Sequence, residues 1–585
     1  MNSLVRRCLS AVRLALVAAA LAATPAWAKL DYRVEIEAPR ELKATLEKGL
    51  NIVRWRLDPE MDEDRLKRLV EEAVRESREA AATDGYFSAR VQAEVDSAGE
   101  PWVVRLKIEP GERTRVADVD IRVSGAAATD GEARPYIQRA RQGWTLRPGE
   151  PFRQSEWEAA KRQAVRAISG WRYAAASVAA SEARIDPATH AAHLSVEIAS
   201  GPPFRFGELR VTGTKRYSDA LVANLAPVHQ GDVYDRDKVV LYQRRLLESG
   251  YFASVQAEID QQPAVADSAP FRVAVIEASK HHVEWGIGYN TDVGPRLEAR
   301  YTNQDVLSSA WRFGSVLNLD QKIENLQLDL NTPPREGGIW DNIFTRARKQ
   351  DIQNQVTREL AIGISHNYGA TAAPSAYIVS AHAEDQNISG IISDTSYAVY
   401  FGARKSFRRT DALISPREGY FISGEVGGSP NALSSQPFLR AVANASLFLP
   451  LGRADDLLLR GQAGAVRSQA REGIPSTFLF RTGGDQTVRG YAFESIGVPE
   501  AGAIVGGRRL IVGSVELTHW VGDNWGVAAF FDAGNAWDSG IRTDIATGYG
   551  AGVRFRTPIG PIRADLAYGA RNSDWRLQFS VGYGF

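Results

Sequence analysis

The pattern of hydrophobic and polar positions changes near His281. Before this residue, apolar side chains recur every three to four positions in several stretches, which predicts amphipathic helices. One such helix carries its apolar residues on a single face: Leu66, Leu69, Val70, Ala73 and Val74. After His281, apolar and polar residues alternate, as in strands whose two faces differ. The sequence therefore predicts a mixed region of helices and strands, followed by an all-strand region.

Alternation is strongest in the stretch Trp575–Phe585. Its odd positions are all apolar or aromatic, and its even positions are all small or polar. A strand sends alternate side chains to opposite faces, so this strand has one apolar and one polar face. A soluble sheet can contain such a strand, but the pattern is also typical of a membrane β-barrel, with the apolar face in lipid and the polar face in the lumen. We favour the barrel, because no turn signal follows the stretch.

The same alternation recurs through residues 280–585. In Val283–Asn290, apolar residues alternate with one acidic residue, two glycines and an asparagine. Farther along, Arg554 and Arg563 fall at polar positions between apolar ones, which suits a polar lumen. At about 19 residues for each strand with its connection, the region is long enough for about 16 antiparallel strands. We therefore predict a membrane β-barrel over residues 280–585.

Composition and motifs argue against several other classes of protein, namely nucleic-acid-binding proteins, helical membrane proteins and enzymes. Lys and Arg number 70 and Asp and Glu also number 70, so bulk charge gives no argument for nucleic-acid binding. Beyond the N-terminus, no apolar run approaches the ~18 residues that a membrane-spanning helix needs, so a membrane protein with this composition must be a barrel. The sequence also contains no Walker-type phosphate loop, no G-x-S-x-G elbow and no Cys/His cluster with metal-ligand spacing. We therefore expect no enzymatic activity and no cofactor.

The N-terminus has the three parts of a secretory signal. Three arginines precede the apolar run Leu14–Ala23, and Ala26-Trp27-Ala28 is an A-x-A cleavage site. We predict that residues 1–28 form a signal peptide that is removed after Ala28. The sequence has one cysteine, Cys8, which lies in this segment, so the mature chain would carry no thiol and no disulfide.

Residues 29–279 contain one unit three times, with a period of about 85 residues. Its clearest mark is G-Y-F, which starts at Gly85 and again at Gly250, and the middle copy has the looser match Gly170-Trp171-Arg172-Tyr173. Each mark ends a helix and is followed by two strands. The second copy's main helix opens with Ser155-Glu156-Trp157-Glu158, which predicts a capping box. Three α+β domains are predicted, over 29–112, 113–201 and 202–279.

The order strand, helix, helix, strand, strand resembles the POTRA (polypeptide-transport-associated) domain. Charged helix positions such as Glu72 and Arg75 are most simply explained as a solvated face. A small three-stranded sheet also has open edges, and an open edge can accept a strand from a partner. The sequence leaves open which edge does so.

Two short motifs in the strand region make the resemblance specific. The segment Arg481–Tyr491 contains V-R-G-Y at Val488–Tyr491, and Phe530–Gly534 reads F-x-D-x-G. Together with the POTRA-like repeats and the terminal aromatic strand, these motifs resemble the superfamily of outer-membrane assembly and translocation barrels. The resemblance covers nearly the whole mature chain and implies a location in the cell outer membrane, with the N-terminal domains in the periplasm.

In that superfamily, V-R-G-Y is the tip of a long extracellular loop that folds back into the lumen. The resemblance implies a lumen latch in which Arg489 pairs with Asp532, and its members are Arg489, Gly490, Tyr491, Asp532 and Gly534. A guanidinium–carboxylate pair can be bidentate and can fix the orientation of such a loop. The alternative is a surface-loop arginine and a turn aspartate that never meet. Glu516 and Arg563 are further candidate lumen charges, for which a merely solvated position is an equal alternative.

The resemblance also implies a lateral gate between the first and last barrel strands, Val283–Asn290 and Leu577–Phe585. The gate residues would be Gly286, Gly288, Gly582, Gly584 and Phe585. Glycine weakens a strand and leaves little side-chain packing to hold a strand pair closed. A client strand could then add to the open edge and gain main-chain hydrogen bonds that are costly to leave unmade in lipid.

Three POTRA-like units with about 16 strands resemble the TamA-like subunits of the translocation and assembly module. This resemblance implies the assembly or insertion of outer-membrane β-barrel proteins, including autotransporters, with a TamB-like inner-membrane-anchored partner. Alternatives are a two-partner secretion-type pore for one dedicated protein, a passive pore, and an outer-membrane enzyme such as a phospholipase. The enzyme would need a Ser/His/acid group near the lipid face, and the sequence contains no recognisable one.

Overall fold

The computed structural model describes residues 30–369, 372–412, 415–538, 540, 544–557 and 562–581. The predicted signal peptide and the predicted gate residues Gly582, Gly584 and Phe585 lie outside this range. The chain divides into two compact units. The first contains residues up to Gly207, Gln230–Asp237 and Asp260–Ala269, and the second contains Glu208–His229, Lys238–Ile259 and Pro270–Phe585.

Three small mixed sheets precede the barrel, with strand orders β1-β3-β2, β4-β6-β5 and β7-β9-β8. The first module contains β1 (Tyr32–Glu37), α2 (Arg40–Gly49), α3 (Asn51–Arg54), α4 (Glu63–Thr83), β2 (Arg90–Asp96) and β3 (Trp102–Glu109). The second contains β4 (Arg115–Ser124), α5 (Ala126–Thr129), α6 (Arg134–Gln142), α7 (Gln154–Ser169), β5 (Ser177–Asp186) and β6 (Ala191–Ala199). The third contains β7 (Phe206–Thr212), α8 (Asp219–Asn224), α9 (Arg236–Glu248), β8 (Phe252–Ile259) and β9 (Ala269–Glu277). These sheets confirm the predicted α+β repeat.

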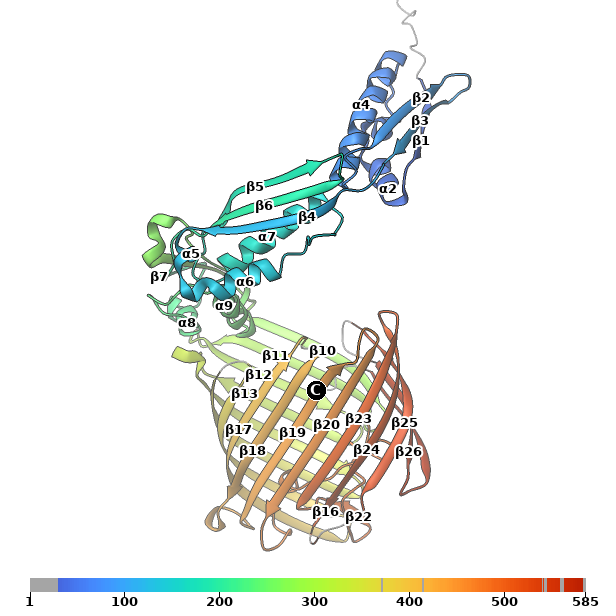
Figure 1. Cartoon of the computed structure of the whole chain (residues 1–585). Coiled ribbons are helices and arrows are strands. Elements are labelled where there is room, and N and C mark those ends of the chain that lie inside the picture. Colours follow the sequence, from blue (N-terminus) through green and yellow to red (C-terminus); the bar gives the residue numbers. More distant parts are fainter. Residues whose placement is uncertain are drawn as a thin grey trace, which may run out of the picture. The chain divides into compact units, whose positions relative to one another are not determined.

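The second module shows how each repeat builds its core. Helices α6 and α7 cover one face of the β4-β6-β5 sheet (Figure 1). Trp144 and Trp157 meet edge to face, with ring centroids 5.7 Å apart, and pack against buried residues of the central strand β6 such as Leu194. The apolar positions that predicted amphipathic helices therefore supply the core of the module.

The predicted capping box at Ser155 is wrong. Helix α7 starts at Gln154 with Arg153 as its N-cap residue, and no side chain caps it. The entry of the chain is fixed by backbone bonds instead, because Phe152 N–H donates to the Thr114 carbonyl at 2.9 Å. Ser155 thus lies inside the first turn, where its hydroxyl cannot serve as the cap.

The second unit contains a closed antiparallel barrel, formed in the described residues by sixteen strands. This confirms the predicted fold class. The strands are β10 (His281–Asn290), β11 (Gly294–Val306), β12 (Trp311–Leu319), β13 (Ile323–Asn331), β14 (Trp340–Ile352), β15 (Gln355–Tyr368), β16 (Ser375–Ile388), β17 (Ile392–Thr410), β18 (Gly419–Ser429), β19 (Phe438–Pro450), β20 (Asp455–Arg467), β23 (Arg509–Val521), β24 (Trp525–Trp537), β25 (Ala546–Phe555), β26 (Ile562–Gly569) and β27 (Asp574–Val581). Figure 1 shows β17 to β20, β23 and β24 side by side and tilted.

Burial follows the predicted alternation. In β27, Leu577 is 67% exposed whereas its neighbour Gln578 is 3% exposed. Val553 and Arg554 of β25 show the same contrast, with the apolar side chain outside and the guanidinium inside. The outer face is therefore apolar and the inner face polar, as a barrel in lipid requires. Among the described residues, no helix is long and apolar enough to cross a membrane.

The third module contacts barrel turns within the second unit. Tyr251 Oη donates to the Ala310 carbonyl at 2.7 Å, and Arg312 Nη1 donates to the Ser249 carbonyl at 2.9 Å. Tyr217 Oη also donates to the Gln304 carbonyl at 3.2 Å. These bonds join the module to the first hairpins of the barrel.

The core of the second module can be tested by Leu194→Ala. Leu194 is buried on the central strand, so truncation should lower the free energy of unfolding of this module by about 2–5 kcal/mol. Val178 on β5 is 37% exposed, and Val178→Ala should cost about 0.5 kcal/mol or less. Urea titration of the full chain in detergent, followed by tryptophan fluorescence, measures both. Equal midpoints for the two variants would contradict the assigned core.

Candidate functional site

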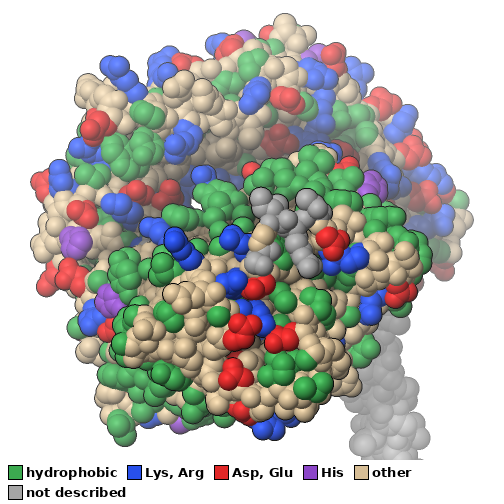
Figure 2. Space-filling model, turned by 90° about the horizontal axis from the view of Figure 1, so that it is seen from below, with side chains coloured by type: hydrophobic (Ala, Val, Ile, Leu, Met, Phe, Trp, Pro, Cys, Tyr) green, Lys and Arg blue, Asp and Glu red, His purple; other side chains and the backbone are tan. Residues whose placement is uncertain are grey.

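The connection between β20 and β23 lies inside the barrel. It covers residues 468–508, here called the lumen loop, and contains the short hairpin β21 (Val498–Glu500) and β22 (Ala503–Val505). Val488 and Tyr491 of the loop are buried in one cluster with inward-facing residues of the strands, among them Val512 and Ala546. Figure 2 views the molecule from below, where basic and acidic side chains are interspersed with hydrophobic ones.

Arg489 lies at the centre of the lumen loop's contacts with the wall. Its Nε and Nη2 donate to the two carboxylate oxygens of Asp532 at 2.7 and 2.9 Å, and its backbone N–H donates to Asp532 Oδ2 at 3.1 Å. Both residues are 1% exposed or less. The structure thus brings together the arginine and the aspartate that the two motifs supplied, in bidentate geometry.

Three more charged residues complete this cluster. Arg489 Nη1 donates to Glu516 Oε2 at 2.6 Å and to Asp565 Oδ2 at 3.4 Å. Arg554 bridges the same two carboxylates, at 3.0 Å to Glu516 Oε1 and 2.5 Å to Asp565 Oδ1. The Phe530 ring lies 3.5 Å from the Arg489 guanidinium carbon, close enough for a cation–π contact. We call Arg489, Glu516, Asp532, Arg554 and Asp565 the charge cluster.

Sequence reasoning supplied only part of this cluster. Glu516 was a candidate lumen charge for which a merely solvated position was an equal alternative, and Arg554 and Asp565 were not singled out as site residues. Their signal was present, because both fall at lumen positions of alternating strands. Spacing along the chain cannot tell which of several lumen charges reaches the loop.

The other predicted latch residues explain how the loop fits. Gly490 has φ +89°, and a Cβ there would lie 2.6 Å from the backbone nitrogen of Gly569. A Cβ on Gly534 would lie 2.9 Å from Val488 Cγ2. Tyr491 Oη donates to the Thr547 carbonyl at 3.0 Å. Gly490 and Gly534 therefore allow the loop backbone to lie directly against the barrel strands, and Tyr491 holds it there through its hydrogen bond.

The lumen loop also holds the turn between β10 and β11. Asn290 Nδ2 donates to Asp485 Oδ2 at 2.8 Å, and Asp485 N–H donates to Asp292 Oδ2 at 2.7 Å. Burial and the neighbouring Asp485 charge raise the pKa of Asp292 from 3.8 to about 7, while Lys322 opposes this shift. Asn290, Asp292 and Asp485 form what we call the hairpin clasp, which no sequence motif predicted.

A different part of the barrel wall binds the loop through other residues. Ser476 donates its backbone N–H and its hydroxyl to Glu384 of β16, at 2.8 and 2.6 Å. Arg481 pairs with Glu494 at 2.7 Å and donates to Gln355 Oε1 at 3.1 Å. The loop therefore joins β15 and β16 to β23, β24 and β26.

A serine, a histidine and a glutamate form a hydrogen-bonded chain beside this anchor. Ser380 Oγ lies 2.8 Å from His382 Nε2, and His382 Nδ1 lies 2.8 Å from Glu359 Oε1. All three side chains are buried, and the Phe478 ring of the lumen loop packs against the imidazole at 4.8 Å. The group faces the lumen loop. An outer-membrane lipase would need such a group on the lipid-facing side of the barrel.

The seam between β10 and β27 is the least extensive strand pairing of the barrel in the described residues. It contains two residue pairs, Tyr289 with Val581 and Asn290 with Ser580. On its other edge, β27 pairs with β26 through every residue from Asp574 to Ser580. Within the described range, Asp574–Gln578 therefore have a strand partner on one edge only.

The two predicted gate glycines that the structure describes lie on β10. A Cβ on Gly288 would lie 3.2 Å from the Val581 carbonyl oxygen across the seam. Among the described residues, a Cβ on Gly286 would meet the Glu298 side chain, at 3.6 Å. Gly288 therefore allows the two strands to approach closely.

Family models match three parts of the chain. Residues 283–585 match the Omp85 superfamily domain. Residues 204–274 match the POTRA model described as surface antigen variable number repeat, and residues 36–110 match the POTRA domain TamA domain 1.

Known relatives agree with these matches. The chain is 22% identical over 586 residues to the outer membrane protein assembly factor BamA of Neisseria meningitidis serogroup B, covering 86% of this chain and 71% of the relative. It is 23% identical over 406 residues to BamA of Nitratidesulfovibrio vulgaris, covering 64% of this chain and 50% of that relative. The crystal structure of Haemophilus ducreyi BamA lacking POTRA domains 1–3 has the same fold, with TM-score 0.60, 15% identity, and coverage of 80% of this chain and 100% of that one.

The charge cluster predicts that Arg489→Ala releases the lumen loop. Removing one partner of a buried ion pair costs about 3–5 kcal/mol, because Asp532 stays buried without its guanidinium partner while Arg554 still bridges Glu516 and Asp565. Amide hydrogen exchange around Val488 and Tyr491 should therefore rise by at least about tenfold. Arg471→Ala is the matched control: Arg471 pairs with Glu500 in the same loop but outside the charge cluster, and at side-chain exposures of 11% and 24% this pair is more open to solvent than Arg489 and Asp532, so its loss should cost less. Equal exchange in both variants would rule out the cluster as the anchor.

The hairpin clasp predicts a pH dependence. Because the pKa of Asp292 is raised to about 7, the clasped state holds a proton that the open state loses above about pH 4. The clasp is then most stable below pH 4 and weakens as the pH rises through 7. A spin label on the exposed position Gln486 should be more mobile at pH 8 than at pH 5. Asp292→Asn should abolish this difference, and an unchanged pH profile in that variant would contradict the assignment.

Proposed function

Because the chain belongs to the Omp85 superfamily, we propose that it assembles or inserts outer-membrane β-barrel proteins through a lateral gate between β10 and β27. The barrel lies in the cell outer membrane and the POTRA modules lie in the periplasm. The observation that carries the proposal is the unequal pairing of β27: Asp574–Gln578 pair with β26 on one edge and have no strand partner on the seam edge among the described residues.

The physical argument concerns main-chain hydrogen bonds. An unpaired backbone group in lipid costs several kcal/mol, so a strand edge at membrane depth is stabilised by any strand that pairs with it. Asp574–Gln578 offer a strand edge without a partner among the described residues, next to the β10–β11 turn, where a client strand could begin to pair. Separating β10 from β11 would break ten residue pairs, whereas Asp574–Gln578 of β27 have no seam partners to lose among the described residues. The seam is therefore where we propose that the barrel opens.

The occupied lumen favours assembly at the seam over a passive pore. The lumen loop is fastened to β16 through Glu384 and to β24 through Asp532. A pore would need these buried contacts to break before anything could pass, which an opening at the seam does not require. A two-partner secretion-type pore for one dedicated protein remains the second candidate, and it would need release of the loop.

A TamA-like role is the finer proposal. Three POTRA-like modules and the similarity of residues 36–110 to the first TamA POTRA domain support it. The proposed clients are outer-membrane proteins including autotransporters, and the proposed partner is a TamB-like protein anchored in the inner membrane.

The gate is tested by a disulfide across the seam. Tyr289 and Val581 are direct partners, so Tyr289→Cys with Val581→Cys lies within the Cα separation that a disulfide spans. The oxidised protein should lose assembly of a denatured outer-membrane barrel in proteoliposomes, and reduction should restore it. The control Ile343→Cys with Ile364→Cys locks an outward-facing pair of β14 and β15 and should leave assembly unchanged. Normal assembly by the seam-locked protein would contradict the lateral gate and favour the secretion-pore alternative.

A further inference from the structure

Arg467 and Arg509 flank the lumen loop on the outer face of the barrel. Arg467 is the last residue of β20 and Arg509 is the first residue of β23, and the lumen loop covers the residues between them. Because Ala465 pairs with Arg509, the two arginines are diagonal neighbours on adjacent strands. Both are exposed and occupy outward positions of their strands, in step with Ile511. Two guanidinium groups therefore share one patch of the outer surface.

This patch lies at the extracellular end of the barrel. The third POTRA module, which is periplasmic, contacts the β11–β12 turn through the bond from Tyr251 to Ala310. Neighbouring strands of the barrel are antiparallel, so the β19–β20 and β23–β24 turns lie at this same end. The lumen loop then joins β20 to β23 at the opposite end. Arg467 and Arg509 are therefore on the side of the outer leaflet.

The residues along β23 give the depth of the patch in the membrane. Between Arg509 and His519, the outward positions are all apolar or glycine: Ile511, Gly513, Val515 and Leu517. At ~3.3 Å per residue this stretch is about 33 Å long, and a strand tilt of about 40° reduces it to a height of roughly 25 Å, the height of the apolar band of such barrels. Trp537 of β24, opposite Arg509, is a residue type enriched at this boundary. The guanidinium groups thus lie at the level of the lipid head groups.

The two ends of the β20–β23 pair differ in charge. At the periplasmic end, Asp455 and His519 are in direct register, and His519 Nδ1 lies 2.8 Å from Asp455 Oδ1. At the extracellular end both charged residues are arginine, and neither Arg467 nor Arg509 forms an ion pair or a side-chain hydrogen bond within the described part of the chain. Two like charges at this spacing repel each other, so an anion between them would be stabilising.

A second group of outward charges at the extracellular end is already paired. Lys349 of β14 lies 2.8 Å from Glu324 of β13, and Arg358 of β15 lies 4.0 Å from Asp385 of β16. The four residues form one row across neighbouring strands. This row holds equal numbers of both charges and needs no further ion, in contrast to the two arginines beside the lumen loop.

We propose that Arg467 and Arg509 bind the phosphate groups of a lipid in the outer leaflet. The class that fits is a bisphosphorylated glycolipid such as lipid A, whose two phosphates match two guanidinium groups and whose acyl chains lie on the apolar face around Leu459 and Val515. Because the arginines flank the lumen loop, the bound lipid joins the two ends of that loop. The inference goes beyond the lateral gate, since this site lies on β20 and β23 and does not require the seam to open.

The test adds lipid A to the full chain in detergent and measures bound lipid by native mass spectrometry. The unchanged protein should retain lipid A, and Arg467→Gln with Arg509→Gln should weaken binding at least about tenfold, since charge-assisted hydrogen bonds are lost. Lipid A without its phosphates should bind the unchanged protein at least about tenfold more weakly for the same reason. This second measurement needs no variant, so it does not depend on how a variant folds.

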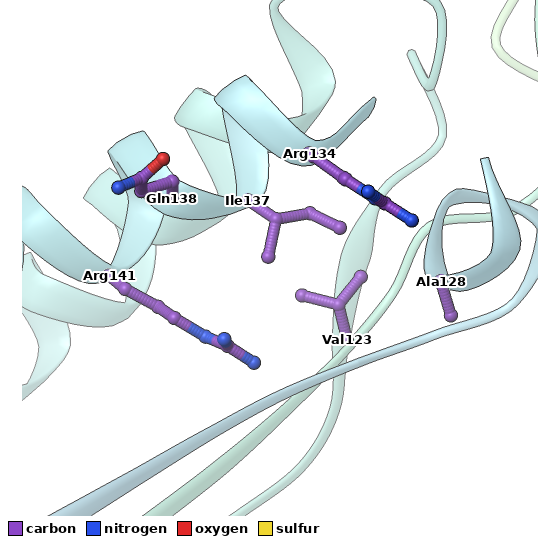
Figure 3. Close-up of a pocket in the computed structure, with 6 residues that line it drawn as sticks. All are labelled: Val123, Ala128, Arg134, Ile137, Gln138 and Arg141. Carbon is purple, nitrogen blue, oxygen red and sulfur yellow. The ribbon is translucent and has the colours of Figure 1, made fainter. Parts of the chain in front are cut away.

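Two control variants remove the same number of positive charges elsewhere. Lys349→Gln with Arg358→Gln removes outward charges that are already paired. Arg134→Gln with Arg141→Gln removes charges from α6 of the second POTRA module, where Figure 3 shows both arginines extending on either side of Ile137. Neither of these two arginines forms an ion pair among the described residues. Both control variants should bind lipid A as the unchanged protein does.

The proposal is overturned if dephosphorylated lipid A binds equally, if the variant at Arg467 and Arg509 retains full binding, or if either control variant loses it. Equal binding of phosphatidylglycerol would overturn it in favour of a general anionic surface. Displacement of lipid A by an equal concentration of inorganic phosphate would overturn it in favour of a site for free phosphate. The oxidised seam-locked protein should bind lipid A normally, so a failed gate and a failed lipid site give different results.

Discussion

The barrel interior depends on one buried charge, the guanidinium group of Arg489. Arg489 is buried to 1% exposure among the carboxylates of Asp532, Glu516 and Asp565, and neither it nor they could remain there alone. Buried charges are stable only when each has an opposite charge beside it. The loop that carries Arg489 is therefore held against the strands that carry Asp532, Glu516 and Asp565.

The seam and the lumen loop are not independent. Asn290 pairs with Ser580 across the seam, and its side chain also donates to Asp485 of the loop. Asp485 lies four residues before Arg489, so the same short segment contacts the first strand's hairpin and the charge cluster. Movement of the first strand therefore affects the loop directly, and an account of the gate that treats the loop as a passive plug omits this contact.

The alternation of residues such as Leu577 and Gln578, repeated through residues 280–585, favoured the barrel, because lipid and lumen impose opposite polarities on neighbouring side chains. The pairing of Arg489 with Asp532 was implied by the family resemblance that two motifs carry. Arg554 did not, since lumen charges are chemically alike until the fold decides which are neighbours. The capping box failed because the start of α7 is fixed by tertiary backbone bonds that its local sequence does not reveal.

The position of the lumen loop has a mechanical consequence. The barrel is closed, but part of β27 has no strand partner on the seam edge among the described residues, so twisting and flattening are resisted less there than along the regular ladders. The loop acts as a spoke across the bore, fixed at Glu384 on one side and at Asp532 on another. Lateral pressure from a bilayer is then carried partly in tension through the spoke, so the circular cross-section does not depend on the seam alone.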